Sequence, residues 1–220
     1  MKNRLAIFAS GNGSNAENII RYFLESDTVE VVLVLSNSPK AKVLERARSL
    51  NISVATFSKE DFYMSEAILK RLLKEKIDWI ILAGFLLKFP EPILQHYKNK
   101  VINIHPALLP KFGGKGMYGM HIHKAVVENK ESETGITIHY VNENYDEGKI
   151  IFQAKTEVLG TDTPEIIAEK IHILEQHHFP KVIENLIINN KNIPRLLLTN
   201  TSIIPPNSRQ VKNINTSITV

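Results

Sequence analysis

Short apolar segments alternate with amphipathic ones along the first half of the chain. The apolar segments are rich in Val, Ile and Leu and have the length of buried strands, whereas the segments between them repeat apolar residues at helical spacing. Five strands are predicted, at residues 5–9, 29–35, 54–57, 77–83 and 101–104. Four helices are predicted between them, at residues 16–24, 40–50, 65–74 and 91–98. This alternation indicates an α/β fold with a Rossmann-like N-terminal half, a mainly parallel twisted sheet and helices on both faces.

The pattern changes in the second half of the chain. Two strand-like runs, residues 135–141 and 149–156, are joined by a polar turn over residues 142–148. Such a pair with a short polar connection predicts a hairpin or two crossing strands. In a mainly parallel sheet, ligands bind at the carboxyl ends of the strands, near the point where the strand order switches. We therefore expect a ligand crevice at that edge.

A long helix is predicted after the second strand-like run. Thr163 is a capping residue, and Pro164 suits the first helical position. We expect the helix to continue to about Ile188, with a bend near Pro180. His177 and His178 lie within it and are interpreted as surface or packing residues.

The last part of the chain differs in composition from the rest. Residues 189–220 are rich in Asn, Thr, Ser and Pro and contain only brief apolar runs. Such a composition favours a C-terminal tail or an edge appendage. The predicted organisation is a single domain over residues 1–188, followed by this tail.

Length and composition agree with one large domain. A chain of 220 residues with 43% hydrophobic residues can bury roughly 70% of the surface that it exposes when unfolded. Its 27 Lys and Arg and 23 Asp and Glu are scattered, which suits a small anionic substrate better than a nucleic acid. There is no Cys, so disulfides, thiolate metal sites and thiol nucleophiles are excluded. The first apolar run is too short for a signal peptide or a membrane span, and we expect a cytoplasmic protein.

A glycine-containing loop, residues 10–15, lies between the first predicted strand and the first predicted helix. Glycine lets the backbone approach an anion, and a helix N-terminus offers free N–H groups. A phosphate could therefore bind at Gly13, Ser14 and Asn15. The loop lacks the third glycine of a dinucleotide fingerprint and the Lys of a P-loop. A plain strand-to-helix turn, with Ser14 or Asn15 as N-cap, fits these residues equally well.

Asn103 and His105 lie two residues apart at the end of the fifth predicted strand. Their side chains therefore point to the same side of the sheet, at the edge where the crevice is expected. Pro106 holds His105 extended. An isolated Asn-x-His more often caps its strand, so the context must decide between a structural and a catalytic role.

Asp146 lies in the turn between the two later strands, where Asp commonly binds its own backbone. If the turn folds over the crevice, Asp146 forms an ion pair with His105 and raises the fraction of imidazolium above that of an unperturbed pKa of ~6.5. Asn103 and His105 would then bind a developing oxyanion while Asp146 accepts the proton of an attacking amine. Such a site performs acyl transfer without an enzyme nucleophile.

A metal site is the alternative interpretation of the histidines. Four of them could gather as ligands: His105, His121, His123 and His139. The His-x-His spacing suits a loop site, but no His-Glu-x-x-His or carboxylate signature accompanies it. We therefore expect no metal.

Four segments, in order, resemble the glycinamide ribonucleotide (GAR) formyltransferases of purine synthesis, which use 10-formyltetrahydrofolate. Residues 10–15 are similar to the family's phosphate loop, and Leu82-Ala83-Gly84-Phe85 to the strand that leads into its folate pocket. Residues 103–110 are similar to its catalytic strand and loop. Residues 135–141, followed by Asp146-Glu147-Gly148, resemble the segment that ends in its catalytic aspartate. The resemblance covers about residues 4–188 and implies the formyltransferase fold.

The resemblance implies a role for each of several residues. The implied catalytic set is Asn103, His105 and Asp146, with His139 in support. The implied GAR-binding residues are Gly13, Ser14 and Asn15 for the phosphate, and Glu175 on the long helix for the ribose hydroxyls. The implied folate pocket consists of Leu86, Leu87, Lys88, Phe89, Tyr140, Val141, Asn142 and Glu143. A cis Leu109-Pro110 bond is also implied.

The implied reaction moves a formyl group from the co-substrate 10-formyltetrahydrofolate to the amine of GAR. No metal, nucleic acid or membrane takes part, and we expect a monomer or a weak homodimer. Commoner family members carry an Arg where this chain has Leu86 and Leu87, and a folate-tail Arg has no counterpart in residues 61–66. Residues 111–120 form a longer loop than in the shortest members. Its four glycines fit a mobile lid and an ordinary surface loop about equally.

Sister activities share the Asn-His-Asp set. A methionyl-tRNA formyltransferase would need a further C-terminal domain, and the roughly 30 residues after the long helix fall short of the ~50 of a small domain. A formyltetrahydrofolate hydrolase would need an N-terminal regulatory domain, whereas the resemblance starts at residue 4. The hydrolase is the second candidate. A non-catalytic phosphate-binding module is the third.

Overall fold

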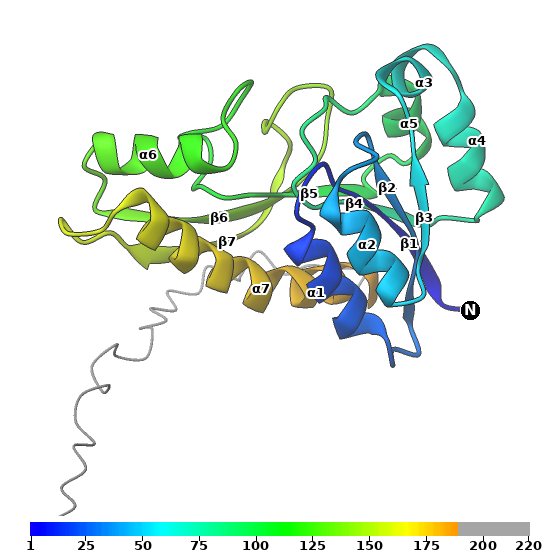
Figure 1. Ribbon diagram of the computed structural model, residues 1–220, viewed down its shortest axis with the longest axis horizontal. Helices are drawn as coiled ribbons and strands as arrows, with labels where there is room; N and C mark the ends of the chain where they lie inside the picture. The colour runs from blue at the N-terminus through cyan, green and yellow to red at the C-terminus, as the bar shows by residue number, and fades with distance from the viewer. Residues whose placement is uncertain (189–220) are drawn as a thin grey trace, which may run out of the picture.

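The computed structural model describes residues 1–188, which form one seven-stranded sheet with helices on both faces (Figure 1). The predicted tail over residues 189–220 lies outside the described residues. The strands are β1 (Asn3–Phe8), β2 (Val29–Ser36), β3 (Ser53–Thr56), β4 (Trp79–Leu82), β5 (Val101–His105), β6 (Glu133–Tyr140) and β7 (Ile150–Glu157). The helices are α1 (Ser14–Phe23), α2 (Lys42–Ser49), α3 (Lys59–Met64), α4 (Ala67–Lys74), α5 (Glu91–His96), α6 (Met120–Glu128) and α7 (Pro164–Ile188).

The strand order is β3-β2-β1-β4-β5-β6-β7. The first five strands pair in parallel, whereas β6 is antiparallel to both β5 and β7. The mainly parallel sheet and the hairpin-like pair in the second half are thus confirmed. The order reverses between β1 and β4, where the N–H of Ser10 donates to the carbonyl of Gly84 over 3.0 Å. This switch point is where a doubly wound sheet opens a crevice for ligands.

Alternating side chains of the strands build two hydrophobic cores, one on each face of the sheet. In β1, Leu5 and Ile7 belong to one core, and Ala6 and Phe8 belong to the other. The first core lies against α1, α2, α6 and α7, and the second against α3, α4 and α5. Because both faces of β1 are covered, its run of apolar residues is continuous rather than alternating.

The predicted helices are confirmed within a few residues, but α3 and α6 were not predicted. The six-residue α3 begins with a capping box between Ser58 and Asp61, and α6 follows Gly119 without a side-chain cap. The long helix α7 begins at Pro164, as predicted, and Pro180 is buried inside it. No helix within residues 1–188 is long and apolar enough to cross a membrane.

His178 of α7 packs against Phe152 of β7, with ring centroids 4.9 Å apart. Its Nε2 is buried and has no hydrogen-bond partner among the described residues. Burial, with help from the neighbouring charges of His177 and Lys181, lowers the pKa of His178 to about 4. His178 is thus a packing residue, as expected from the sequence, and its ring is neutral in the folded protein at neutral pH.

Acid should destabilise the protein through His178. The pKa of His178 is lower in the folded state than the ~6.5 of the unfolded chain. The free energy of unfolding is therefore highest above pH 6.5, where the ring is neutral in both states, and decreases as the pH falls towards 4, because the unfolded chain binds the proton more readily. Allowing for partial exposure, we expect a loss of about 1 kcal/mol between pH 7 and pH 5. Urea unfolding at both pH values should show a smaller loss for His178→Phe than for the parent. The exposed His96→Gln serves as control and should behave like the parent; equal losses in parent and His178→Phe would contradict the assignment.

Candidate active site

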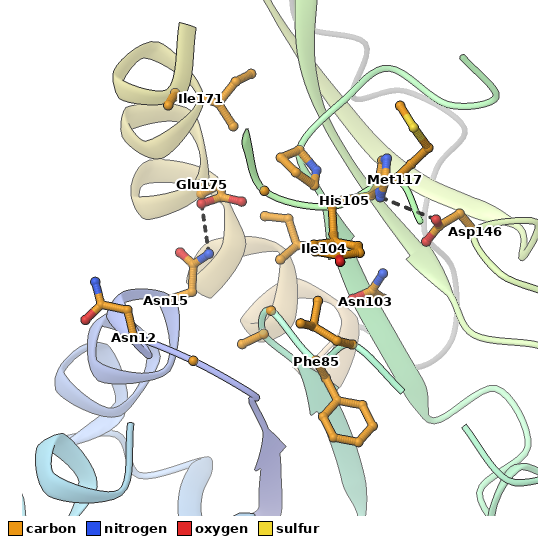
Figure 2. A pocket seen from close by; sticks show the side chains of 18 of the residues that line it. Asn12, Asn15, Phe85, Asn103, Ile104, His105, Met117, Asp146, Ile171 and Glu175 are labelled. Atoms are coloured by element: carbon orange, nitrogen blue, oxygen red, sulfur yellow. Dashed lines mark hydrogen bonds and ion pairs between the residues drawn. The ribbon is translucent and has the colours of Figure 1, made fainter. Parts of the chain in front are cut away.

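A cavity of about 580 Å³ lies at the carboxyl ends of β1, β4 and β5, where the switch in strand order predicted a crevice (Figure 2). Its walls come from segments far apart in the sequence. These are the loop after β1, the ends of β4 and β5, the glycine-rich loop before α6, the turn between β6 and β7, and the middle of α7. The cavity therefore brings the predicted phosphate loop and the predicted catalytic residues to one place.

Gly13 shapes the phosphate-loop end of the cavity. It is the N-cap of α1, has a φ of 78°, and no side chain caps the helix. The first N–H groups of a helix have no acceptor within the helix, and here no side chain supplies one. They are therefore available to an anion. A Cβ at Gly13 would lie 2.4 Å from the Cβ of Val43 in α2, so only glycine fits. The alternative of an N-cap at Ser14 or Asn15 is wrong.

The side chain of Asn15 faces α7. Its Nδ2 donates to Oε2 of Glu175 over 2.9 Å, and its Oδ1 accepts from Nε2 of Gln176 over 2.8 Å. Both ends of the amide therefore have a partner on α7, and the second hydrogen of Nδ2 and the backbone N–H of Asn15 remain for a ligand. The same contact brings Glu175 beside the phosphate loop (Figure 2).

Arg46 of α2 holds the phosphate loop from its outer side. Its guanidinium donates to the backbone carbonyl and to the side-chain oxygen of Asn12, each over 3.0 Å, and it pairs with Glu17 of α1. A guanidinium presents several donors in a fixed plane, so it can bind all three acceptors at once. These contacts fix the loop relative to α1 and α2.

Asn103 and His139 are directly opposite in the antiparallel pair β5–β6. The Nδ1 of His139 lies 2.8 Å from the carbonyl of Tyr140, and its Nε2 lies 3.1 Å from Nδ2 of Asn103. Since a carbonyl can only accept, Nδ1 of His139 carries a hydrogen, and since an amide nitrogen can only donate, Nε2 accepts from Asn103. The amide of Asn103 is thereby oriented, and its second N–H remains for a group in the cavity. His139 thus contacts the amide of Asn103, one of the predicted catalytic residues.

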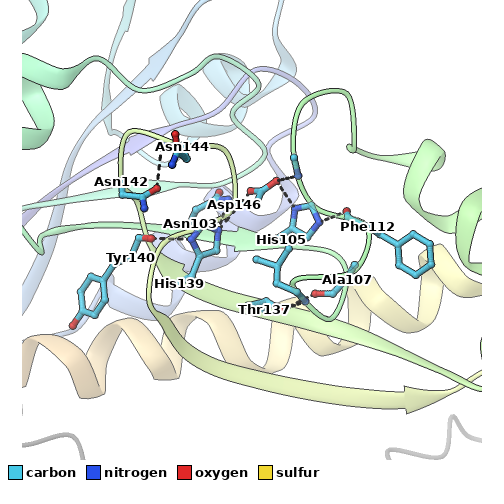
Figure 3. A network of polar contacts seen from close by, with 12 residues as sticks. Asn103, His105, Ala107, Phe112, Thr137, His139, Tyr140, Asn142, Asn144 and Asp146 are labelled. Carbon is cyan, nitrogen blue, oxygen red and sulfur yellow. Dashed lines mark hydrogen bonds and ion pairs between the residues drawn. The ribbon is translucent and has the colours of Figure 1, made fainter.

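His105 lies between Asp146 and the loop before α6 (Figure 3). Its Nε2 donates to the carbonyl of Phe112 over 2.8 Å, and its Nδ1 lies 3.5 Å from Oδ2 of Asp146. That carboxylate also accepts the N–H of Gly114 over 3.0 Å, and its Oδ1 lies 3.6 Å from Nε2 of His139. The turn therefore folds over the crevice and brings Asp146 to His105.

The predicted rise in the imidazolium fraction of His105 is wrong. Burial lowers the pKa of His105 and outweighs the nearby charge of Asp146 and the Phe112 carbonyl, which act in the opposite direction. His105 is only 4% exposed, so its charged form loses almost all of its hydration. Burial also favours the neutral acid of Asp146, but the neighbouring imidazoles of His139 and His105 and the N–H of Gly114 together lower the pKa of this carboxyl. The pair therefore consists of a neutral imidazole and a carboxylate.

The predicted folate residues lie at two places. Leu86 lines the main cavity. Leu87, Lys88, Phe89, Val141 and Asn142 line a smaller adjoining cavity of about 50 Å³, which also touches Asn103 and Asp146. Tyr140 and Glu143 line neither cavity. Phe89 is 3% exposed and packs edge-on to Phe8, so it also belongs to the core.

Two histidines of the cavity were not among the predicted site residues. His172 lies one turn before Glu175 on α7, with its Nδ1 3.8 Å from Oε2 of Glu175, and this neighbouring carboxylate raises the pKa of His172. The spacing of three residues on a predicted helix was a usable signal. His123 of α6 is buried, which lowers its pKa, and its Nδ1 has no partner among the described residues. Because α6 was not predicted, nothing in the sequence indicated which side His123 faces.

The loop over residues 111–120 contributes to the site through its first part. Phe112 and Gly114 bind His105 and Asp146, and the following glycine-rich residues line the main cavity. Within residues 1–188, no group of three or more His, Cys, Asp or Glu side chains is arranged to hold a metal ion. The Leu109-Pro110 peptide bond that leads into this loop is cis, as the resemblance implied.

Comparison with known proteins agrees with this geometry. The family model described as "Formyl transferase" matches residues 3–183. The chain is 40% identical over 182 residues to the chloroplastic phosphoribosylglycinamide formyltransferase of Arabidopsis thaliana, covering 80% of this chain and 62% of that one. It is 37% identical over 194 residues to the phosphoribosylglycinamide formyltransferase of Bacillus subtilis, covering 86% of this chain and 97% of that one. It thus spans less than two thirds of the plant relative and nearly all of the bacterial one.

Solved structures are similar as well. Glycinamide ribonucleotide transformylase 1 from Geobacillus kaustophilus superposes with a TM-score of 0.77 at 37% identity, covering 85% of this chain and all of that one. The enzyme of the same name from Symbiobacterium toebii gives a TM-score of 0.79 at 30% identity, with 88% and 92% covered. The family match over most of the chain, the shared fold and the Asn103, His105 and Asp146 cluster lead to one conclusion: the chain belongs to the formyl transferase family.

Proposed function

We propose that this protein transfers the formyl group of 10-formyltetrahydrofolate to the amine of GAR, giving formyl-GAR and tetrahydrofolate in purine biosynthesis. The observation that carries the proposal is one cavity with two chemically different ends. One end has the open N–H groups of α1 beside Glu175, and the other has Asn103, His105 and Asp146. The first end suits a phosphorylated ribose and the second suits transfer of a formyl group to an amine. The names of the similar plant and bacterial proteins support this choice of acceptor.

The acceptor end would hold GAR by its phosphate and its ribose. The backbone N–H groups of Gly13, Ser14 and Asn15 would bind the phosphate, where the dipole of α1 favours negative charge. Glu175 would accept the ribose hydroxyls. One of its oxygens already binds Asn15, so the carboxylate is held in place and its other oxygen is left for the substrate. An acceptor bound in this way would have to reach from the phosphate loop to the catalytic end of the cavity.

The catalytic end would act on the formyl carbon. The amine of GAR attacks this carbon, and the second N–H of Asn103 stabilises the oxyanion that forms. Nδ1 of neutral His105 takes a proton from the amine, and the carboxylate of Asp146 stabilises the resulting imidazolium. The proton then passes to N10 of the folate as the carbon–N10 bond breaks. No covalent intermediate with the protein is formed.

The formyl donor would occupy the side of the cavity next to Leu86, Leu87 and Lys88. Together with Phe89, Tyr140, Val141, Asn142 and Glu143 these residues are the proposed folate pocket. The adjoining cavity of about 50 Å³ touches both Asn103 and Asp146, which would bring a donor bound there to the catalytic end. This cavity is smaller than a pterin ring system requires, so donor binding would have to widen it.

Turnover with both substrates tests the proposal. The protein is mixed with GAR and 10-formyltetrahydrofolate, and the change in folate absorbance is followed with and without GAR. Turnover that depends on GAR is expected. Absence of turnover with both substrates would refute the transferase, and equal turnover without GAR would identify a formyltetrahydrofolate hydrolase instead.

Replacing Glu175 with Ala should raise the KM for GAR by about 10- to 100-fold, because hydrogen bonds to a charged group are lost. The kcat and the KM for the folate should change little. Glu184→Ala is the matched control, since Glu184 lies on the same helix and binds Tyr22 away from the cavity. Steady-state kinetics with each substrate varied in turn measures both effects. A rise confined to the folate KM would show that Glu175 serves the donor.

A further inference from the structure

Two backbone groups of the loop after β5 hold the catalytic pair. The carbonyl of Phe112 accepts from Nε2 of His105, and the N–H of Gly114 donates to Asp146. The carbonyl has a specific effect on His105, because it requires the hydrogen of the neutral ring to be on Nε2. Nδ1 is then free to accept a proton. Asp146 has the opposite preference, since a carboxylate beside Nδ1 favours a hydrogen there.

His105, Thr137 and Gln153 form one row across three neighbouring strands. His105 pairs with Thr137 between β5 and β6, and Thr137 pairs with Gln153 between β6 and β7. Directly opposite residues in antiparallel strands present their side chains on the same face of the sheet. Gln153 is thus aligned with the catalytic histidine although it lies two strands away.

Thr137 and Gln153 bind the loop through Ala107 and Leu109. Figure 3 shows Thr137 beside Ala107. The hydroxyl of Thr137 donates to the Ala107 carbonyl over 2.7 Å and accepts the Leu109 N–H over 3.0 Å. Nε2 of Gln153 donates to the Leu109 carbonyl over 3.1 Å and to the Thr137 hydroxyl over 2.9 Å. Every hydrogen and lone pair of the hydroxyl, and both hydrogens of the amide, are used. Both backbone groups of Leu109 are therefore fixed.

Leu109 passes this constraint on to the residues that touch the catalytic pair. Cδ2 of Leu109 packs so closely on Gly113 that a Cβ there would lie only 2.6 Å away. Gly113 is the residue between Phe112 and Gly114, whose backbone groups bind His105 and Asp146. A shift of Leu109 would consequently move the Phe112 carbonyl. Gln153 itself lines neither of the two cavities described above.

We propose that Gln153 is a positioning residue of the active site, which acts through Thr137 and Leu109 to keep the Phe112 carbonyl on Nε2 of His105. This keeps the lone pair of the ring on Nδ1, where it can accept the proton of the attacking amine. The inference rests on the proposed function only for the use of that proton. The tautomer of His105 is a property of the protein without substrates.

Loss of the Gln153 amide tests the inference. In Gln153→Met the side chain keeps its length but has no hydrogen to donate. We expect part of the His105 population to move its hydrogen to Nδ1, which nitrogen-15 chemical shifts of the ring report in the substrate-free chain at pH 7.5. The His105 signals are assigned with His105→Gln. The kcat should fall by about 10- to 100-fold, with both KM values within about threefold of the parent.

Three further variants separate positioning from general loss of packing. Thr137→Val removes the same contacts from the other side and should reproduce the effect, whereas Thr137→Ser keeps the hydroxyl and should retain the parent tautomer and kcat. Phe152→Leu weakens packing at the neighbouring residue of β7, whose side chain is on the opposite face. If neither Gln153→Met nor Thr137→Val changes the tautomer, or if both match Phe152→Leu in kcat, the inference is overturned. An inactive parent would refute the proposed function and would leave the tautomer comparison intact.

Discussion

Replacing Asp146 with Asn is expected to lower kcat by about 10³-fold or more while GAR binding stays almost unchanged. The amide has the shape of the carboxylate, and its oxygen can still accept the N–H of Gly114. It carries no charge, however, so the imidazolium formed when His105 takes the amine proton loses its stabilisation. The loss occurs after the substrates have bound and therefore affects kcat rather than affinity. Steady-state rates and calorimetric titration with GAR measure the two quantities.

Asp162→Asn is the matched control for this variant. Asp162 also accepts a backbone N–H in a turn, that of Leu159 over 2.9 Å, and it pairs with Lys170 away from the cavity. Its replacement should lower stability and leave kcat close to that of the parent. Comparable rates for Asp146→Asn and the parent would remove Asp146 from the mechanism.

The pH dependence of kcat gives a second readout of Asp146. His105 has to be neutral to accept a proton, so activity should be lost as the pH falls through its pKa. Burial lowers this pKa, which puts the acid limb below the ~6.5 of an ordinary histidine. Asp146 opposes that lowering, so in Asp146→Asn the residual activity should fall off at a still lower pH. An acid limb above 6.5 in the parent would contradict a neutral resting His105.

The inner strands β1, β2, β4 and β5 could be predicted from the sequence because their apolar runs reflect burial on both faces of the sheet. The two missed helices had weaker signals. In α3, six residues are too few for helical periodicity, and only the capping box of Ser58 and Asp61 indicated its start. The start of α6 follows Gly119, with a φ of 52°, and has no capping side chain. Its position is determined by packing against α7, which no local pattern reveals.

The site was predictable where it depends on register and not where it depends on tertiary contacts. Asn103 and His105 share a face because they are two residues apart on β5, and this was visible in the sequence. The direction of the pKa shift of His105 was not visible in the sequence, because it depends on how deeply the ring is buried in the folded protein. The side chain of Asn15 likewise depends on Glu175, a residue 160 positions away. The sequence therefore indicated Asn15 as a phosphate ligand but did not show that α7 holds its side chain.

Asn103→Asp should be almost as damaging as the loss of Asp146. The aspartate has the same size but no N–H for the oxyanion, and it adds a negative charge where negative charge develops. Removal of a single oxyanion donor lowers kcat by about 10²- to 10³-fold. We expect a loss of this size for Asn103→Ala and a still lower kcat for Asn103→Asp. The added carboxylate also faces Nε2 of His139, which accepts from the amide in the parent.

The two Asn103 variants together separate electrostatics from loss of shape. Asn18→Asp is the control, because Asn18 donates its amide hydrogen to the Gln176 carbonyl outside the cavity. Its kcat should stay near that of the parent. Single-turnover measurements at saturating substrates isolate the chemical step, and direct titration with the folate checks that the donor still binds. If Asn103→Ala is slower than Asn103→Asp, the amide acts mainly by holding His139 in place. The expected order, with Asp slower than Ala, requires that the Asn103 N–H acts on the charge of the transition state.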